Sequence, residues 1–317
     1  MKILFITATR IGDAVLSTGA LDHFIRTCPD AEITVACGPL VAGLFAPAPC
    51  VVRVIALKKE SYGRHWWKLL RATMGEDWDI IVDLRNSAVS RILRGKKKFI
   101  WRGSDKKGHK VEQIAAVLGA SPPPGPILWP DHIAQAEADR LIPAGAPFIA
   151  IGPTANWAGK AWPAQNFVAL AKAMTAQGSI LEGARVAVFA APGEEAAALP
   201  VLNALPAHQR IDMIAKTSPL TAAAVISRAE IYIGNDSGLT HIAAAVGTPT
   251  LALFGYGWPE QYRPWGKHAA YISTPETPEQ LLGGRDIKSV TSSLMGSLTV
   301  TAAVEAAVRL WDRTRKY

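Results

Sequence analysis

A polar turn that contains glycine stands between an apolar run and an apolar, helix-like segment in the second half of the chain. It reads GNDSGLTH over residues 234–241 and follows the apolar residues 231–233. A helix that begins in such a turn points free backbone N–H groups, and the positive end of its dipole, at whatever lies above the sheet. The Ser237 and Gly238 amides are therefore predicted to bind a phosphate, with His241 one turn further on.

Asp236 in the same turn would repel a phosphate. Its carboxylate can instead bind a sugar hydroxyl, or it can cap the following helix. In the second case Asp236 and Ser237 have a purely structural role and His241 is only a packing residue. This segment alone leaves both interpretations open.

A second turn of this kind follows the first apolar run, where residues 7–13 read TATRIGD. Gly12 would allow a ligand to approach the backbone closely. Asp13 stands at a helix start, where the helix dipole favours the charged carboxylate, and such a group can act as a general base. An ordinary helix cap is an equally good interpretation. The turn lacks the GxGxxG pattern, which argues against a dinucleotide-dependent dehydrogenase.

A third segment, residues 152–163, reads GPTANWAGKAWP and follows another apolar run. Thr154 offers a hydroxyl, and Lys160 offers a point charge that can bind a diphosphate. The alternative is a solvent loop with a charged tip. Two tryptophans make such a loop unusual, because this residue type prefers burial or a contact.

Three segments together resemble glycosyltransferase family nine, the lipopolysaccharide heptosyltransferases. They read RIGDAVL at 10–16, NWAGKAWP at 156–163 and NDSGLTHIAAAVGTPTLALFG at 235–255. Their order and spacing agree with the family over almost the whole chain. The resemblance implies a GT-B fold, in which two Rossmann-like parallel-sheet domains enclose an interdomain cleft. It also implies sugar transfer from a nucleotide-sugar donor, with inversion at the anomeric carbon and without a bound metal or cofactor.

The resemblance also implies a role for each matching residue. Asp13 corresponds to the catalytic base, Lys160 to the group that neutralises the donor diphosphate, and Asp236 to the acidic residue near the donor sugar. An acidic residue that contacts the nucleotide ribose is implied at Glu194 or Glu195, and the pattern does not separate these two. The full set of predicted donor contacts is Gly12, Thr154, Lys160, Glu194, Glu195, Asp236, Ser237, Gly238 and His241.

The leading functional interpretation is transfer of a heptose from ADP-heptose to a lipopolysaccharide-core or related anionic glycolipid acceptor. Two others stay open. One is a GT-B nucleotide-sugar 2-epimerase, which needs no acceptor, and the other is a non-catalytic module that binds nucleotide sugars or nucleic acid. The acceptor side carries no motif that resembles the family.

The elements that must position these residues alternate regularly along the chain. Short apolar runs alternate with amphipathic segments, which predicts βα units and two doubly wound α/β domains. We expect an acceptor-side domain at 1–145, a donor-binding domain at 146–317 and a hinge at 143–147, and a final helix at 299–315 that can return across the cleft. The predicted strands are 2–7, 32–37, 51–55, 79–83, 98–101, 148–152, 185–190, 231–234 and 250–254. The predicted helices are 13–26, 62–74, 111–118, 133–141, 164–177, 194–205, 220–228, 238–246 and 300–311.

The excess positive charge lies in the first part of the chain. Residues 1–125 contain 19 basic and 11 acidic side chains, whereas the remainder contains 15 of each, and the whole chain has a net charge of +8. Such a field suits an anionic partner. Arg64, Trp66 and Lys97, which represent the basic clusters at 53–71 and 91–110, are candidates for contact with the acceptor or the inner membrane. A solvated charged face is the alternative, and nucleic acid is not expected because no nucleic-acid motif accompanies the charge.

Composition also bears on the compartment. The three cysteines, Cys28, Cys37 and Cys50, form an odd number without a CxxC pair, which favours a reducing environment. No apolar stretch is long enough for a signal peptide or a membrane span. We therefore expect a cytoplasmic protein that can work at the cytoplasmic face of the inner membrane.

Overall fold

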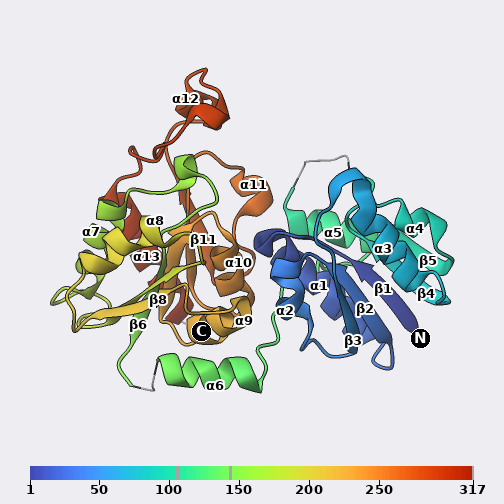
Figure 1. The fold of residues 1–317 in the computed structure, drawn as a ribbon. Helices are drawn as coiled ribbons and strands as arrows, with labels where there is room; N and C mark the ends of the chain where they lie inside the picture. The colour runs from blue at the N-terminus through green and yellow to red at the C-terminus, as the bar shows by residue number, and fades with distance from the viewer. Residues whose placement is uncertain (104–107, 143–144, 316–317) are drawn as a thin grey trace. The chain divides into compact units, whose positions relative to one another are not determined.

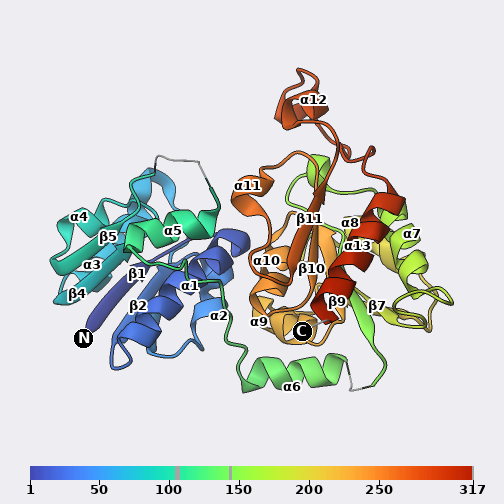
Figure 2. The same cartoon turned by 180° about the vertical axis from the view of Figure 1, so that it is seen from behind.

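The computed structural model describes residues 1–103, 108–142 and 145–315. The chain divides into two compact units, Met1–Asp131 and His132–Tyr317 (Figures 1 and 2). Each unit is built on its own parallel sheet and is described by itself. Lys106 and Lys107 of the basic clusters, and Pro143 and Ala144 of the predicted hinge, lie outside the described residues.

The first unit contains a five-stranded parallel sheet. Its central strands read as nearly continuous apolar runs because helices cover both of their faces, and Ile3, Leu4, Phe5 and Ile6 are fully buried. In spatial order the strands are β3 (Val51–Ala56), β2 (Glu32–Cys37), β1 (Lys2–Ile6), β4 (Trp78–Asp83) and β5 (Gly95–Ile100). The helices are α1 (Ile11–Thr27), α2 (Ala42–Phe45), α3 (Arg64–Thr73), α4 (Val89–Ile92) and α5 (Lys110–Leu118).

The second unit contains a six-stranded parallel sheet. In spatial order its strands are β11 (Ala269–Ser273), β10 (Thr250–Phe254), β9 (Ile231–Asn235), β6 (Phe148–Gly152), β7 (Arg185–Ala190) and β8 (Arg210–Ile214). The helices are α6 (His132–Leu141), α7 (Ala164–Thr175), α8 (Glu195–Asn203), α9 (Pro219–Ile226), α10 (Gly238–Ala245), α11 (Pro259–Tyr262), α12 (Pro278–Leu282) and α13 (Val300–Arg315).

Each sheet reverses its winding direction at one place. In the first unit the chain moves outward from β1 to β2 and β3 and then returns to β4 on the other side of β1. In the second unit it moves from β6 to β7 and β8 and returns to β9 beside β6. Ligands of open α/β sheets bind at such a reversal, beyond the carboxyl ends of the strands. The turns after β1, β6 and β9 are therefore the places to look for a site.

Helix α6 belongs to the second unit. It packs against α9, and the Arg228 guanidinium forms a 2.7 Å ion pair with Asp139. The compact units consequently meet at 131/132, whereas the sequence suggested a boundary at 145/146. The turn that was read as the hinge follows α6 and connects it to β6 within the second unit.

The final helix, α13, also packs on its own unit. It contacts α7, β10 and β11, and it buries Ala303, Ala307, Leu310 and Trp311 in the core of the second unit (Figure 2). The apolar face of this helix therefore covers the second sheet. In the described part of the chain, no helix is both long and apolar enough to cross a membrane.

Candidate active site

Three turns of the second unit meet at the carboxyl edge of its sheet. Strands β9, β6 and β7 are neighbours and run parallel, so their carboxyl ends lie side by side. The turn after β6 carries Thr154 and Lys160, the turn after β7 carries Glu194, and the turn after β9 carries Asp236 and Ser237. Segments that are about eighty residues apart in sequence are thus brought together at the winding reversal.

Lys160 and Asp236 form an ion pair across this reversal. Lys160 Nζ donates to Asp236 Oδ2 at 2.5 Å, and both side chains are largely buried, with 25% and 13% of their surfaces exposed. Asp236 therefore does not repel anions from an otherwise positive turn. Its carboxylate holds the ammonium group of Lys160 at the edge of the sheet, where that group can also meet an anionic ligand.

The side chain of Asn235 connects the same two turns by hydrogen bonds. Its side chain is fully buried, its Nδ2 donates to the Pro153 carbonyl at 2.8 Å, and its Oδ1 accepts the Trp162 amide at 3.0 Å. A buried amide with both ends bonded fixes the relative position of the segments that it connects. The sequence assigned no role to Asn235, which was signalled only by its place within a polar motif at a strand end.

Of the two candidate glutamates, Glu194 lies beside Thr154. Thr154 Oγ1 donates to Glu194 Oε2 at 2.6 Å, and the Ala191 amide donates to the same oxygen at 3.1 Å. Glu195 instead accepts the Gly193 amide, and this bond together with the Glu195 amide lowers the pKa of its carboxyl group. Glu194 therefore belongs to the cluster at the sheet edge, whereas Glu195 stabilises its own turn.

Helix α10 begins in the turn after β9. Within the described residues, the side chain of its N-cap residue, Ser237, makes no capping hydrogen bond, and the Asp236 carboxylate bonds to Lys160. The interpretation of these two residues as a mere helix cap is therefore not what the structure shows. Gly238 opens the helix, and His241 is buried one turn further along.

A buried phenol supports the ends of the two central strands. Tyr232 is fully buried, and burial raises its pKa to about 12, so the hydroxyl stays neutral at physiological pH. Its ring lies over Gly234 and over Gly152, the register partner of Gly234 on β6. A Cβ atom at either glycine would overlap the Tyr232 hydroxyl. Sequence reasoning missed Tyr232, because a tyrosine in a buried strand reads as an ordinary core residue.

Residues 290–298, near the C-terminus, hold the Lys160 turn in place. Trp157 Nε1 donates to the Val290 carbonyl at 3.2 Å, and Trp162 Nε1 donates to the Leu298 carbonyl at 2.8 Å. The Leu294 amide donates to the Gly159 carbonyl at 3.2 Å. Both tryptophans of the turn are therefore contact residues, as their type suggested, and residues 290–298 acquire a structural role.

In the first unit, Gly12 and Asp13 lie in the first turn of α1, directly after β1 at the winding reversal. Asp13 is half-buried, and the N-cap of this helix, Arg10, makes no side-chain capping bond to the described residues. The Thr7 and Ser17 hydroxyls are hydrogen-bonded at 2.7 Å and tie the turn to the helix behind it. Asp13 is thus presented at the edge where ligands of such sheets bind.

Lys110 is the charged neighbour of Asp13 within this unit. It begins α5, which packs on α1, and its ammonium group lies 3.8 Å from the centre of the Trp101 ring. Burial lowers the pKa of Lys110, and the negative charge of Asp13 acts in the opposite direction. The sequence analysis placed Lys110 only in a basic cluster, because the packing of α5 on α1 is not visible in a pattern of charges.

The residues predicted to contact the acceptor or the membrane are placed differently from one another. Arg64 and Lys97 are exposed. Trp66 instead packs against the core of the first unit, with the Arg85 guanidinium 5.4 Å from its ring centre. Its neighbour Trp67 is 65% exposed. Neighbouring positions on a helix point in different directions, and the sequence did not show which one faces inward.

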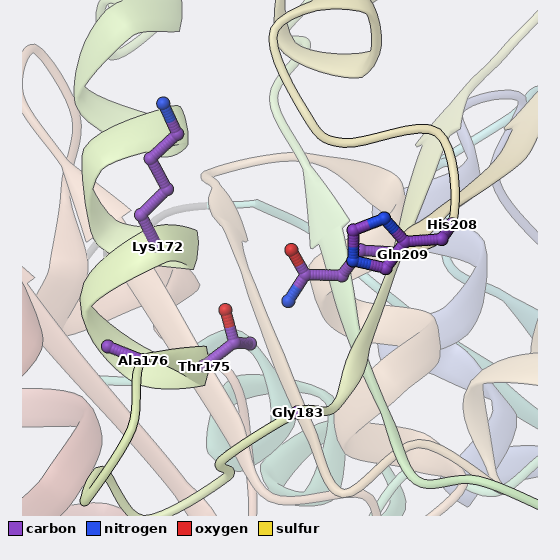
Figure 3. Close-up of a pocket in the computed structure, with 6 residues that line it drawn as sticks. All are labelled: Lys172, Thr175, Ala176, Gly183, His208 and Gln209. Atoms are coloured by element: carbon purple, nitrogen blue, oxygen red, sulfur yellow. The ribbon is translucent and has the colours of Figure 1, made fainter.

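A separate hollow of about 340 Å³ opens on the second unit. Figure 3 shows α7 on one side of it, with Lys172 and Thr175, and His208 and Gln209 on the other. Gly183 and Gln209 precede β7 and β8, so this hollow lies at the amino edge of the sheet. Because ligands of such sheets bind at the carboxyl edge, we do not assign the hollow to the active site.

The sequence is similar to those of known proteins. The family model for glycosyltransferase family 9 (heptosyltransferase) matches residues 120–284. Lipopolysaccharide heptosyltransferase 2 of Salmonella typhimurium is 30% identical over 310 residues, which cover 86% of this chain and 88% of that protein. The chain belongs to glycosyltransferase family 9, and the enzyme class expected from its three motifs is confirmed.

Solved structures share the fold. The family 9 glycosyltransferase from Veillonella parvula matches with a TM-score of 0.81 at 18% identity, over 98% of this chain and 97% of that one. The Escherichia coli ADP-heptose LPS heptosyltransferase II matches with a TM-score of 0.76 at 22% identity, over 99% and 100% of the two chains. The predicted GT-B architecture of two Rossmann-like domains is thereby confirmed.

Proposed function

We propose that this glycosyltransferase transfers a heptose from ADP-heptose to a lipopolysaccharide-core or related anionic glycolipid acceptor. The names of the Salmonella and Escherichia coli proteins support the choice of sugar, nucleotide and acceptor class. The observation that carries the donor assignment is the joined pair of turns after β6 and β9, where Lys160, Asp236 and the start of α10 meet at the winding reversal. We propose that the enzyme acts at the cytoplasmic face of the inner membrane.

The donor side accounts for stabilisation of the leaving group. The diphosphate gains negative charge as the bond from its oxygen to the anomeric carbon breaks, and a cation and amides placed there stabilise that charge more in the transition state than in the ground state. Lys160 and the Ser237 and Gly238 amides supply these groups, so the reaction needs neither a bound metal nor another cofactor. Glu194 is assigned to the ribose hydroxyls, and Asp236 to Lys160 and the donor sugar.

Asp13 is assigned as the base. Its carboxylate accepts the proton of the acceptor hydroxyl while the acceptor oxygen forms its bond to the anomeric carbon. ADP leaves from the opposite face of the sugar in the same step, so the configuration at that carbon inverts. The position of Asp13 at the reversal of the first sheet supports this role.

The test compares wild-type protein with Asp13→Asn, using ADP-heptose and a lipopolysaccharide acceptor truncated before its heptose residues. We expect wild-type transfer that persists in excess EDTA, with an inverted anomeric configuration by NMR. Loss of one general base costs about 10²–10⁴ in rate, so Asp13→Asn should lose transfer and still bind ADP. Transfer at the wild-type rate by Asp13→Asn would overturn the base assignment. Isomerisation of the donor without acceptor would indicate the epimerase instead.

A further inference from the structure

The outer face of α3 exposes large apolar side chains among cations; we call it the α3 surface. Tyr62, Trp67 and Met74 are 99%, 65% and 65% exposed, respectively. Isolated exposed apolar residues are normal on a soluble protein, but two aromatic rings and a methionine beside one short helix are not scattered. The cationic members of the α3 surface are Lys58, Lys59, Arg64, Lys68 and Arg71, all of them exposed.

Helix geometry shows that Trp67 lies outside the core of the first unit. Trp67 and Met74 are seven residues apart, which is two helical turns, so they share one face. Leu69, Leu70 and Thr73 lie on a different side of the helix and are buried, and Trp66 packs on the same core. The core of the first unit is therefore already closed by other residues of this helix.

Tyr62 extends the apolar part of the surface beyond the helix. It lies in the turn before α3 with a φ of 54°, in the left-handed region, and is followed by Gly63 with a φ of 69°. Within the described residues, Tyr62 is the most exposed of the large hydrophobic side chains. Tyrosine suits an interface between water and lipid, because its ring is apolar and its hydroxyl is polar.

The positive charges of the α3 surface are complementary to an anionic membrane surface. Of its five cations, Lys68 forms an ion pair with Glu60, and among the described residues Lys58, Lys59, Arg64 and Arg71 form no ion pair. Residues 1–125 contain the whole net charge of +8. Cations that flank exposed aromatic residues are typical of helices that lie on anionic membranes, where the rings enter the headgroup region and the cations meet lipid phosphates.

We propose that the α3 surface docks the enzyme on an anionic phospholipid membrane. Tyr62 and Trp67 enter the headgroup layer, and Lys58, Arg64 and Arg71 contact the phosphates. The inference rests on the proposed function, because membrane docking serves an enzyme whose acceptor is anchored in the membrane. Docking holds the enzyme where its acceptor is concentrated.

Vesicle sedimentation tests the proposal directly. Wild-type protein should sediment with phosphatidylcholine vesicles that contain phosphatidylglycerol, and should remain in the supernatant with phosphatidylcholine alone. Trp67→Ser and Tyr62→Ser should each lower the affinity for the anionic vesicles by about tenfold, which corresponds to losing the burial of one aromatic side chain. Arg64→Gln with Arg71→Gln should reduce binding and its dependence on salt.

Two matched controls lie in the second unit. Ile133 is 66% exposed on α6, and Arg309 is an exposed cation on α13. Ile133→Ser and Arg309→Gln should sediment as the wild type does. Equal sedimentation of Trp67→Ser and wild type would overturn the proposal, as would equal binding to neutral and anionic vesicles. Binding to duplex RNA without binding to vesicles would overturn it in favour of a nucleic-acid surface.

Transfer assays separate a failure of this proposal from a failure of the proposed function. With a delipidated, water-soluble acceptor, Trp67→Ser should be as active as the wild type, whereas transfer to acceptor embedded in vesicles should fall with the loss of binding. If the wild type transfers nothing to either acceptor, the proposed function fails while sedimentation still decides the docking. If Trp67→Ser is equally active on both acceptors, docking through the α3 surface is overturned.

Discussion

The Lys160–Asp236 pair determines how charge is arranged where the donor is expected to bind. An ion pair that is largely buried contributes little net stability by itself, but removal of one partner leaves the other as an uncompensated charge. The two side chains are 25% and 13% exposed, so each depends on the other. A ligand with anionic oxygens can share the ammonium group without breaking the pair, because that group has three donors.

Replacement of Lys160 by methionine should weaken donor use. Loss of a cation at the leaving diphosphate is expected to lower kcat/KM by about 10²–10³. ADP affinity, measured by calorimetry, should fall as well, because the same contact is present in the complex with product. Lys172→Met is the matched control, since Lys172 is exposed at the amino edge of the sheet. Unchanged ADP affinity in Lys160→Met would show that the diphosphate binds elsewhere.

Lys110 gives a prediction about stability and pH. Burial lowers the pKa of Lys110 in the folded protein, so between that pKa and the ordinary value of 10.5 the unfolded chain binds more protons. The cost of holding the charge is therefore present at neutral pH and disappears as the pH rises towards 10.5. The stability of Lys110→Met relative to wild type, measured by urea unfolding, should accordingly decrease as the pH rises from 7 to 10. The opposite slope would contradict the burial of this charge.

At the residue scale, the sequence identified turns that the structure brings together at the edge of the second sheet, and it left their internal bonds open. Lys160, Asp236 and Thr154 were identified by type and by position after strands. That Lys160 pairs with Asp236, and that Glu194 rather than Glu195 meets Thr154, depends on side-chain directions that no spacing rule determines. Asn235 and Tyr232 were missed because their partners lie on strands that are distant in sequence.

The central strands of the second sheet end in two glycines for a steric reason. Gly152 and Gly234 are register partners, and the Tyr232 ring covers both. A buried ring that extends along the sheet leaves no space for a Cβ at either position. The two neighbouring strands β6 and β9 therefore carry no side chain at these positions, next to the turns that carry Lys160 and Asp236.

Gly152→Ala should therefore destabilise the protein through steric overlap. Overpacking of a closed core costs about 1–3 kcal/mol, which should be seen as a fall of several degrees in Tm. Tyr232→Phe in the same chain should restore part of the loss, because it removes the atom nearest to the new methyl group. Gly43→Ala is the control, since among the described residues no atom lies within 4 Å of a Cβ at that position. A Gly152→Ala variant as stable as wild type would show that the ring moves freely.

At the element scale, the differences between prediction and structure lie in edge strands and in short helices, since α2, α4, α11 and α12 were not predicted. The central strands were predicted to within a residue or two, because burial on both faces makes them apolar throughout. The missed strands β8 and β11 are the two edges of the second sheet. Strand β5, an edge of the first sheet, was predicted to begin at 98 and begins at Gly95, because three exposed lysines occupy its start. An edge strand needs only one apolar face, and charged residues there prevent pairing with other chains.

The two units differ in charge and in the chemistry assigned to them. All of the net positive charge lies in residues 1–125, whereas the cluster assigned to the donor lies in the second unit. The sequence predicted this asymmetry and the GT-B class from composition and motifs. It could not predict that α6 and α13 both pack on the second unit, because that result depends on which apolar face finds a partner.

The identity of the nucleotide can be tested on the whole protein. A ligand that binds only the native state stabilises it by about 2.7 kcal/mol at a concentration one hundred times its Kd. ADP should therefore raise Tm by several degrees, and equal concentrations of UDP and GDP should raise it less. Lys160→Met should respond less to ADP than the wild type does. A larger response to UDP or GDP would contradict ADP-heptose as the donor.

The Tyr232 phenol lies across the ends of β6 and β9, so substitutions at positions 152, 232 and 234 depend on one another during evolution. A lineage cannot gain a side chain at position 152 or 234 while the tyrosine at 232 remains, because the intermediate protein would be overpacked. Loss of the tyrosine first makes room at position 152, whereas a Cβ at position 234 would still lie 2.8 Å from the Gly152 carbonyl oxygen. Among descendants of this sequence, position 152 is therefore expected to change only after position 232 has changed, so that one buried core residue restricts how this edge of the sheet can evolve.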